Sequence, residues 1–181
     1  MRQTIQSYYD AFRIAFSMMT TLPFFALHEF KEDINGKSVI FYPLIGLIIG
    51  LILFASYTLL SSLFAHAHLM VLIFALYIAI TGALHLDGFV DAIDGLLSYQ
   101  SKEKALLIMK DPNIGAMGAV FLVVLLSLKL SSFIHLEEMW HLLLIPMLSR
   151  FTPLIAIYYF SYGTNKGMAT LIKKTLQRDI L

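Results

Sequence analysis

Four long apolar segments constrain the fold of this 181-residue chain more than any other feature. They cover residues 39–64, 69–86, 114–134 and 141–160 and contain few charges. The hydrocarbon core of a bilayer is about 30 Å thick, and a helix of roughly 20 apolar residues crosses it. The composition, 59% hydrophobic and 14% charged with a mean hydropathy of +0.77, is typical of a membrane protein. We predict an all-α, polytopic integral membrane helix bundle with about four transmembrane helices, forming a single domain over residues 1–181.

The basic residues predict the orientation of this bundle, because cytoplasmic loops are enriched in Lys and Arg. Eleven of the 13 basic residues precede the first span, separate the second from the third, or follow the fourth. The other two, Lys129 and Arg150, lie inside spans, and the loops on the opposite side have none. We predict a multi-pass protein of the cell membrane with both termini cytoplasmic. The net charge of +1 and the lack of a basic run give no reason to expect a nucleic-acid partner.

Residues 5–27, before the first span, mix aromatic residues and methionine with Asp10 and Arg13. This mixture favours an amphipathic helix that lies in the cytoplasmic interface of the membrane. The alternative is a weakly charged fifth span, but its uncharged part, residues 15–27, is shorter than a bilayer requires.

Three aspartates, Asp87, Asp91 and Asp94, follow the second apolar segment. Their spacing of i, i+4 and i+7 places them on one narrow stripe of a helix. Bare carboxylates in lipid would cost about 2.5–3.5 kcal/mol each, so the stripe needs a compensating partner. Oxygen ligands favour Mg²⁺ or Mn²⁺ over zinc, and the chain has no cysteine for a thiolate site. We predict that the three aspartates bind Mg²⁺ and, with it, a phosphorylated substrate.

The alternative for this stripe is a solvated helix face just beyond the membrane. Bulky apolar residues such as Phe89 and Val90 flank the aspartates on both sides, and this favours the metal site. His85 lies nearly opposite Asp87 on the helix. It is either a histidine hydrogen-bonded to a neighbouring helix or a substrate-binding residue, and we do not assign it as a magnesium ligand.

A second cluster, with the sequence MKDPNIGAMG, precedes the third span. Asp111 and Pro112 are typical of the N-cap and first position of a helix. The N–H groups at the start of this span could bind a phosphate. Gly115 and Gly118 would let a substrate or a neighbouring helix approach the backbone. Lys110 would neutralise a phosphate oxygen or lie among the lipid headgroups.

Two basic residues lie within spans. Arg150 is at the middle of the fourth, where an arginine normally faces a polar cavity or an acidic partner. We expect its guanidinium to bind phosphate or diphosphate; an ion pair with one of the aspartates is the alternative. Lys129, near the far end of the third span, is expected to extend to the outer interface.

Together these motifs resemble the cobalamin synthase family, the adenosylcobinamide-GDP ribazoletransferases or cobalamin-5'-phosphate synthases. The family pattern HLDG-x-x-D-x-x-DG is met by His85, Asp87, Gly88, Asp91, Asp94 and Gly95. The pattern M-[KR]-D-x-x-[IL]-G-x-x-G is met by Met109, Lys110, Asp111, Ile114, Gly115 and Gly118. The likeness extends from about residue 10 to about residue 172.

The resemblance implies transfer of the adenosylcobinamide-phosphoryl group from adenosylcobinamide-GDP to α-ribazole or its 5'-phosphate, releasing GMP, late in vitamin B12 biosynthesis. Asp87, Asp91 and Asp94 would hold Mg²⁺ on the diphosphate. Asp111, or an aspartate that does not bind metal, would take the proton of the ribazole hydroxyl. Lys110 and Arg150 would hold phosphate oxygens.

Members of this family usually continue through further spans and a late GGxTGDxxG stretch, which the sequence here does not contain. We expect this chain to insert into a membrane, since each span satisfies its own backbone hydrogen bonds, but to turn over poorly or not at all. An apolar flank left exposed would favour a homo-oligomer.

Two other functions would also use such a stripe. One is another Mg-dependent membrane phospho- or prenyltransferase, but the sequence patterns of the CDP-alcohol and polyprenyl types are absent. The other is a non-enzymatic cation-binding or transport protein. A transporter would need acidic or polar residues near mid-membrane on two or more spans, and only Arg150, of the wrong charge, lies so deep.

Overall fold

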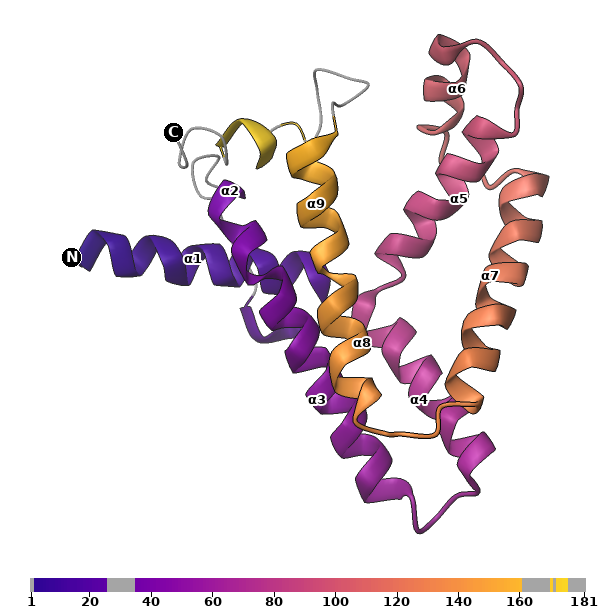
Figure 1. Cartoon of the computed structure of the whole chain (residues 1–181). Helices are drawn as coiled ribbons and strands as arrows, with labels where there is room; N and C mark the ends of the chain where they lie inside the picture. The colour runs from indigo at the N-terminus through magenta and orange to yellow at the C-terminus, as the bar shows by residue number, and fades with distance from the viewer. Residues whose placement is uncertain (1, 26–34, 161–169, 171, 176–181) are drawn as a thin grey trace. The chain divides into compact units, whose positions relative to one another are not determined.

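The computed structural model describes residues 2–25, 35–160, 170 and 172–175, and every regular element within them is a helix (Figure 1). This confirms the prediction of an all-α fold. The chain divides into two compact units, each of which is described separately below.

The first unit combines Met1–Leu59 with Glu138–Leu181. Its helices are α1 (Arg2–Met19), η1 (Pro23–Phe25), α2 (Asn35–Ser38), η3 (Val39–Phe41), α3 (Tyr42–Leu60), α8 (His141–Ser149) and α9 (Phe151–Tyr159). Helix α1 lies across the beginning of α3 (Figure 1). It buries Ala11, Ile14 and Ala15, whose spacing forms one apolar face of a helix.

Helices α3 and α8 pack through two glycines of α3, Gly46 and Gly50, which are one helical turn apart. A Cβ on Gly50 would lie 2.6 Å from the carbonyl oxygen of Leu143 and 2.7 Å from that of Leu142. A Cβ on Gly46 would collide with the carbonyl oxygen of Pro146. Small residues at this spacing let helices in membranes approach closely, and van der Waals contact then stabilises the pair.

The second unit, Leu60–Glu137, contains the aspartates. Its helices are α4 (His66–Thr81), α5 (Leu84–Leu96), α6 (Lys102–Ile108) and α7 (Ala116–Ile134). The ring of Phe133 on α7 packs on α4, with its centroid 5.1 Å from that of Phe74 and 6.0 Å from that of Tyr77. Helix α5 continues from the far end of α4 to the beginning of α7, and α6 lies between α5 and α7 in the sequence (Figure 1).

The second apolar segment ends earlier than its hydropathy predicts. Helix α4 stops at Thr81, and α5 begins at Leu84 at an angle of 83° to it. The predicted span 69–86 is therefore wrong at its C-terminal end. Gly82 and Ala83 form this elbow, both in the left-handed region with φ values of 62° and 56°. Such residues cannot continue a right-handed helix.

Three helical segments are long and apolar enough to cross a membrane: Gly36–Leu60, Ala116–Ile134 and His141–Tyr159. The bent pair α4 and α5 makes four if it counts as one span. This agrees with the prediction of about four transmembrane helices. Helix α1 is amphipathic, as predicted for residues 5–27; residues 26 and 27 lie outside the described residues, and the position of α1 in the interface stays a prediction.

The close packing of α3 on α8 predicts that Gly50→Ala lowers stability. The added methyl group would overlap backbone oxygens of α8, which cannot move as a side chain can, and such overpacking costs about 1–3 kcal/mol. We expect a lower thermal midpoint in detergent. Gly88→Ala is the matched control, because nothing lies within 4 Å of its added Cβ. Equal midpoints for both variants would show that α3 and α8 tolerate separation.

Candidate active site

The aspartates lie on α5, on the side of the elbow away from α4, rather than at the end of a continuous span. Asp87 is in the first turn of α5 and is exposed, whereas Asp91 and Asp94 are half-buried. Val90 points to the same side as Asp94 and is buried. The aspartate stripe is therefore part of a helix that packs on α7 with one edge and leaves the other edge open.

Asp94 holds the beginning of α7. Its Oδ2 accepts a hydrogen bond of 2.8 Å from the backbone N–H of Gly115, and its Oδ1 accepts one of 2.8 Å from that of Gly118. Gly115 is the N-cap of α7 and has no side chain that could accept a hydrogen bond from these N–H groups. The first N–H groups of a helix lack intrahelical partners, and an anion there is also favoured by the helix dipole. Asp94 thus caps α7 from a different helix.

Gly115 and Gly118 are required by this contact. A Cβ on either glycine would collide with the Asp94 carboxylate, and one on Gly118 would also lie 2.8 Å from Cγ1 of Val90. The sequence predicted that these glycines admit a substrate or a neighbouring helix. The structure shows that they admit α5, and the phosphate that we expected at the N–H groups of Gly115 and Gly118 would compete with Asp94.

Asp87 and Asp91 form the open part of the stripe. Gly88, between them in sequence, has nothing within 4 Å of the position of a Cβ. No group of three His, Cys, Asp or Glu side chains in the described residues is close enough to hold a metal ion. The structure thus does not bring Asp87, Asp91 and Asp94 together as three ligands. Asp87 and Asp91 remain oxygen donors of the kind that Mg²⁺ prefers, and substrate phosphates and water commonly complete such a site.

Asp111 does not cap α7. Helix α7 begins at Ala116, and the Asp111 Oδ1 instead accepts hydrogen bonds from the backbone N–H of Asn113 (3.0 Å) and from its side-chain amide (2.7 Å). The expected cap at Asp111 and Pro112 is therefore wrong. The sequence D-P-N forms a local turn, since aspartate readily bonds to the backbone two residues on. These bonds to Asn113 hold the pKa of Asp111 below its ordinary value.

The other predicted residues lie outside this contact. Lys110 is exposed on the same loop as Asp111. Arg150 belongs to the first unit, where it joins α8 to α9 and is only 1% exposed. Its Nη1 donates hydrogen bonds to the carbonyl of Pro146 (3.3 Å) and to Oγ of Ser149 (3.0 Å). The binding of phosphate by Lys110 and Arg150 stays a prediction.

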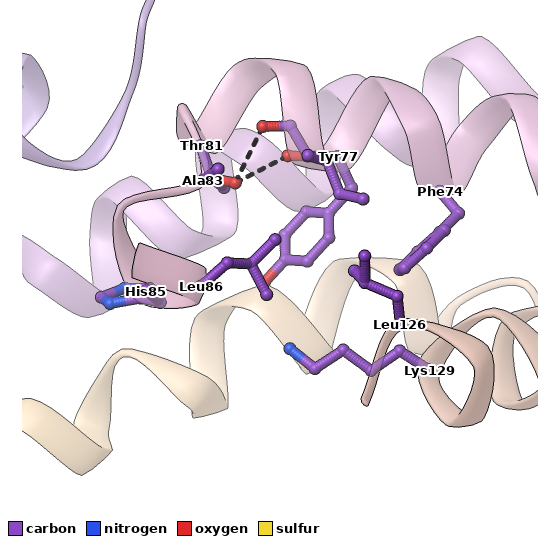
Figure 2. Close-up of a pocket in the computed structure, with 9 residues that line it drawn as sticks. Phe74, Tyr77, Thr81, Ala83, His85, Leu86, Leu126 and Lys129 are labelled. Carbon is purple, nitrogen blue, oxygen red and sulfur yellow. Dashed lines mark hydrogen bonds between the residues drawn. The ribbon is translucent and has the colours of Figure 1, made fainter. Parts of the chain in front are cut away.

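His85 lines a small pocket at the elbow between α4 and α5, together with Lys129 of α7 (Figure 2). Lys129 therefore extends toward the elbow and not, as predicted, toward the outer interface. Sequence reasoning missed this pocket because the elbow that forms it does not show in the hydropathy. The pair Gly82-Ala83 after Thr81 was the available signal, since glycine often ends a helix.

Comparisons with known proteins agree with the motifs. The sequence profile of the cobalamin-5-phosphate synthase family matches residues 11–181. The adenosylcobinamide-GDP ribazoletransferase of Alkaliphilus oremlandii is 39% identical over 152 residues, which cover 84% of this chain and 62% of that protein. That of Desulfitobacterium hafniense is 36% identical over 160 residues, covering 85% and 63%. That of Acetivibrio thermocellus is 37% identical over 174 residues, covering 90% and 70%.

The chain thus spans slightly less than two thirds of the length of the first two relatives. No solved structure matches it significantly.

The cap on α7 predicts that Asp94→Ala loosens the second unit. The variant loses two hydrogen bonds to a charged group, each worth about 1.5–3 kcal/mol. We expect faster hydrogen exchange at the amides of Gly115 and Gly118 and a lower thermal midpoint. Asp87→Ala serves as the control, because its exposed side chain does not contact α7 in the hydrogen bonds described. Unchanged protection of both glycine amides in Asp94→Ala would contradict the capping role.

Proposed function

The chain belongs to the cobalamin-5-phosphate synthase family, and from this membership we propose that it acts as an adenosylcobinamide-GDP ribazoletransferase. The observation that carries the proposal is the match over residues 11–181, which includes both the aspartate stripe and the loop that leads to α7. The relatives named for this activity share 36–39% identity with most of the chain. The proposed substrates are adenosylcobinamide-GDP and α-ribazole or its 5'-phosphate.

The reaction is a phosphoryl-type transfer. A ribose hydroxyl oxygen of α-ribazole attacks the phosphorus linked to cobinamide, a new P–O bond forms, and the bond from that phosphorus to the bridging oxygen of the diphosphate breaks. GMP leaves with the bridging oxygen, and the hydroxyl proton passes to a base. When the 5' position already bears a phosphate, that phosphate is carried unchanged into the product, and GMP is again the leaving group.

Asp87 and Asp91 are the proposed magnesium ligands, because they form the open edge of α5 and provide only oxygen donors. Bound Mg²⁺ would stabilise the negative charge that develops on departing GMP. Asp94 contributes by fixing α5 on α7 through its bonds to Gly115 and Gly118. This revises the predicted set of three equivalent ligands: two aspartates bind the metal and the third positions them.

Asp111 is the proposed proton acceptor. Like any exposed aspartate it is ionised at neutral pH and can receive a proton, and the bonds from Asn113 lower its pKa further, which weakens it as a base. Both hydrogen bonds from Asn113 end on Oδ1, and Oδ2 receives none from the described residues. Lys110, next to it on the exposed loop, would attract the phosphates. His85 is not required by this proposal.

Asp91→Asn should abolish the activity while leaving the fold intact. The neutral amide has the shape of the carboxylate but is a poor ligand for Mg²⁺, and we expect a loss of roughly 10²–10³-fold in GMP release. The purified chain is given adenosylcobinamide-GDP, α-ribazole and Mg²⁺, and two quantities are measured: retention of the coloured corrinoid and release of GMP. Glu103→Gln, an exposed acidic residue of α6, is the control.

Both readouts should disappear when a chelator replaces Mg²⁺. A chain that neither retains the corrinoid nor releases GMP is not a transferase of this type. Full activity of Asp91→Asn would instead show that the protein catalyses the reaction without the aspartate stripe.

We also propose that the loop between α5 and α6 faces the cytoplasm, on the side where the nucleotide substrate occurs. The chain has no cysteine, so single cysteines report their location directly. In intact cells, Ser62→Cys, in the exposed turn after α3, should react with a membrane-impermeant maleimide. Ser101→Cys, in the loop before α6, should react only after the cells are opened. The reverse pattern would invert the topology.

A further inference from the structure

A pocket lies inside the elbow of α4 and α5, on the side that faces α7 (Figure 2). Its volume is about 40 Å³. At roughly 10–15 Å³ for each water molecule by this measure, it has room for about three waters. That is the size of one phosphate-type oxyanion group, and it is too small for a nucleotide or a corrinoid.

The walls of the pocket combine apolar side chains with a few polar groups. The apolar part is formed by Phe74, Ile78, Leu86 and Leu126. The polar part comes from three helices: Tyr77 and Thr81 on α4, His85 on α5, and Lys129 on α7. No acidic residue in the described part of the chain lines it. A concave, mostly apolar site with a small number of converging polar groups is typical of a ligand site.

The charge of Lys129, an exposed residue of α7, is not balanced by any residue that the structure describes. Lys129 lies in the apolar helix α7 and forms no hydrogen bond or ion pair with any residue that the structure describes. A cation inside a span is costly and normally has a partner. Figure 2 shows the Lys129 side chain extending along the pocket toward Leu86 and the ring of Tyr77. An anion in the pocket would supply the missing partner.

The backbone conformation at the elbow also supports a ligand site. Ala83, which lines the pocket, has φ 56° although it is not a glycine, a conformation that costs about 1–2 kcal/mol. Such strain persists where the surrounding structure imposes it, and it is concentrated at functional sites. The bend also directs the beginning of α5, the positive end of its dipole, to the edge of the pocket.

We propose that the elbow pocket binds a single phosphate-type oxyanion group, held by the Lys129 ammonium beside the Tyr77 hydroxyl and the His85 imidazole. The group is either the phosphate of a phospholipid headgroup or free inorganic phosphate. This proposal does not depend on the transferase activity, since none of the proposed magnesium ligands or the proton acceptor lines the pocket.

A structural explanation of Lys129 is the rival: the ammonium would stabilise the carbonyl end of α4. Thr81 already serves that end, because its hydroxyl donates to the carbonyls of Tyr77 (2.9 Å) and Ile78 (3.2 Å), the dashed lines of Figure 2. The two explanations differ in what Lys129→Met does. A site for an oxyanion loses its ligand, whereas a structural contact loses stability with no ligand present.

The test compares wild-type protein with Lys129→Met, Lys129→Arg and Lys104→Met in detergent. Lys104 is an exposed lysine of α6 in the same unit and is the matched control. One arm measures binding of radiolabelled inorganic phosphate by equilibrium dialysis. The second counts retained phosphatidylglycerol by native mass spectrometry, with a neutral diacylglycerol as the comparison.

Wild type, Lys129→Arg and Lys104→Met should bind alike, and Lys129→Met should bind roughly 10- to 100-fold more weakly, as expected when a charged hydrogen bond is lost. Binding in the first arm identifies free phosphate as the source, and binding in the second arm alone identifies the lipid. No binding in either arm, or equal binding by Lys129→Met, overturns the proposal. If the protein binds neither probe and ligand-free Lys129→Met has a lower thermal midpoint than ligand-free wild type, the structural explanation replaces the proposal.

Discussion

The carboxylate of Asp94 holds α5, the helix of the aspartate stripe, on the beginning of α7. Apolar surface gives little attraction between helices in lipid, because the acyl chains are as apolar as the side chains, so polar contacts and close packing decide which helices associate. Asp94 supplies two charged hydrogen bonds between α5 and the beginning of α7. The position of α5, and with it that of Asp87 and Asp91, depends on this contact. The two glycines of α7 are part of the same contact, since any side chain there would displace the carboxylate.

This contact explains why the two sequence motifs occur together. The spacing of HLDG-x-x-D-x-x-DG places three aspartates on one stripe, but the stripe meets two environments. Its last member faces the G-x-x-G of the second motif, and its first two members remain on the open edge of α5. The second motif therefore positions the first, because Gly115 and Gly118 accept the carboxylate of Asp94.

The sequence predicts the spans well and the contacts between them poorly. Hydropathy identified α3, α7 and the α8–α9 pair because each averages over many apolar residues. It placed the second span too far along the chain, since Gly82 and Ala83 interrupt the helix without changing the hydropathy. The pairing of Asp94 with Gly115 joins residues 21 positions apart, and the spacing within either motif does not reveal it. By contrast, the close packing at Gly46 and Gly50 could have been predicted from their spacing alone.

The two ends of helix α5 lie beside charged groups of opposite sign. At its beginning lie the strained Ala83 and the cation of Lys129, and near its end lies the anion Asp94. The two charges differ in how the protein accommodates them. Asp94 is balanced by N–H groups and by the positive end of α7, so it needs nothing from outside. Lys129 has no such partner among the described residues. Helix α5, which carries the aspartate stripe, thus has one end stabilised by the protein, and our proposal assigns the stabilisation of the other end to an external anion.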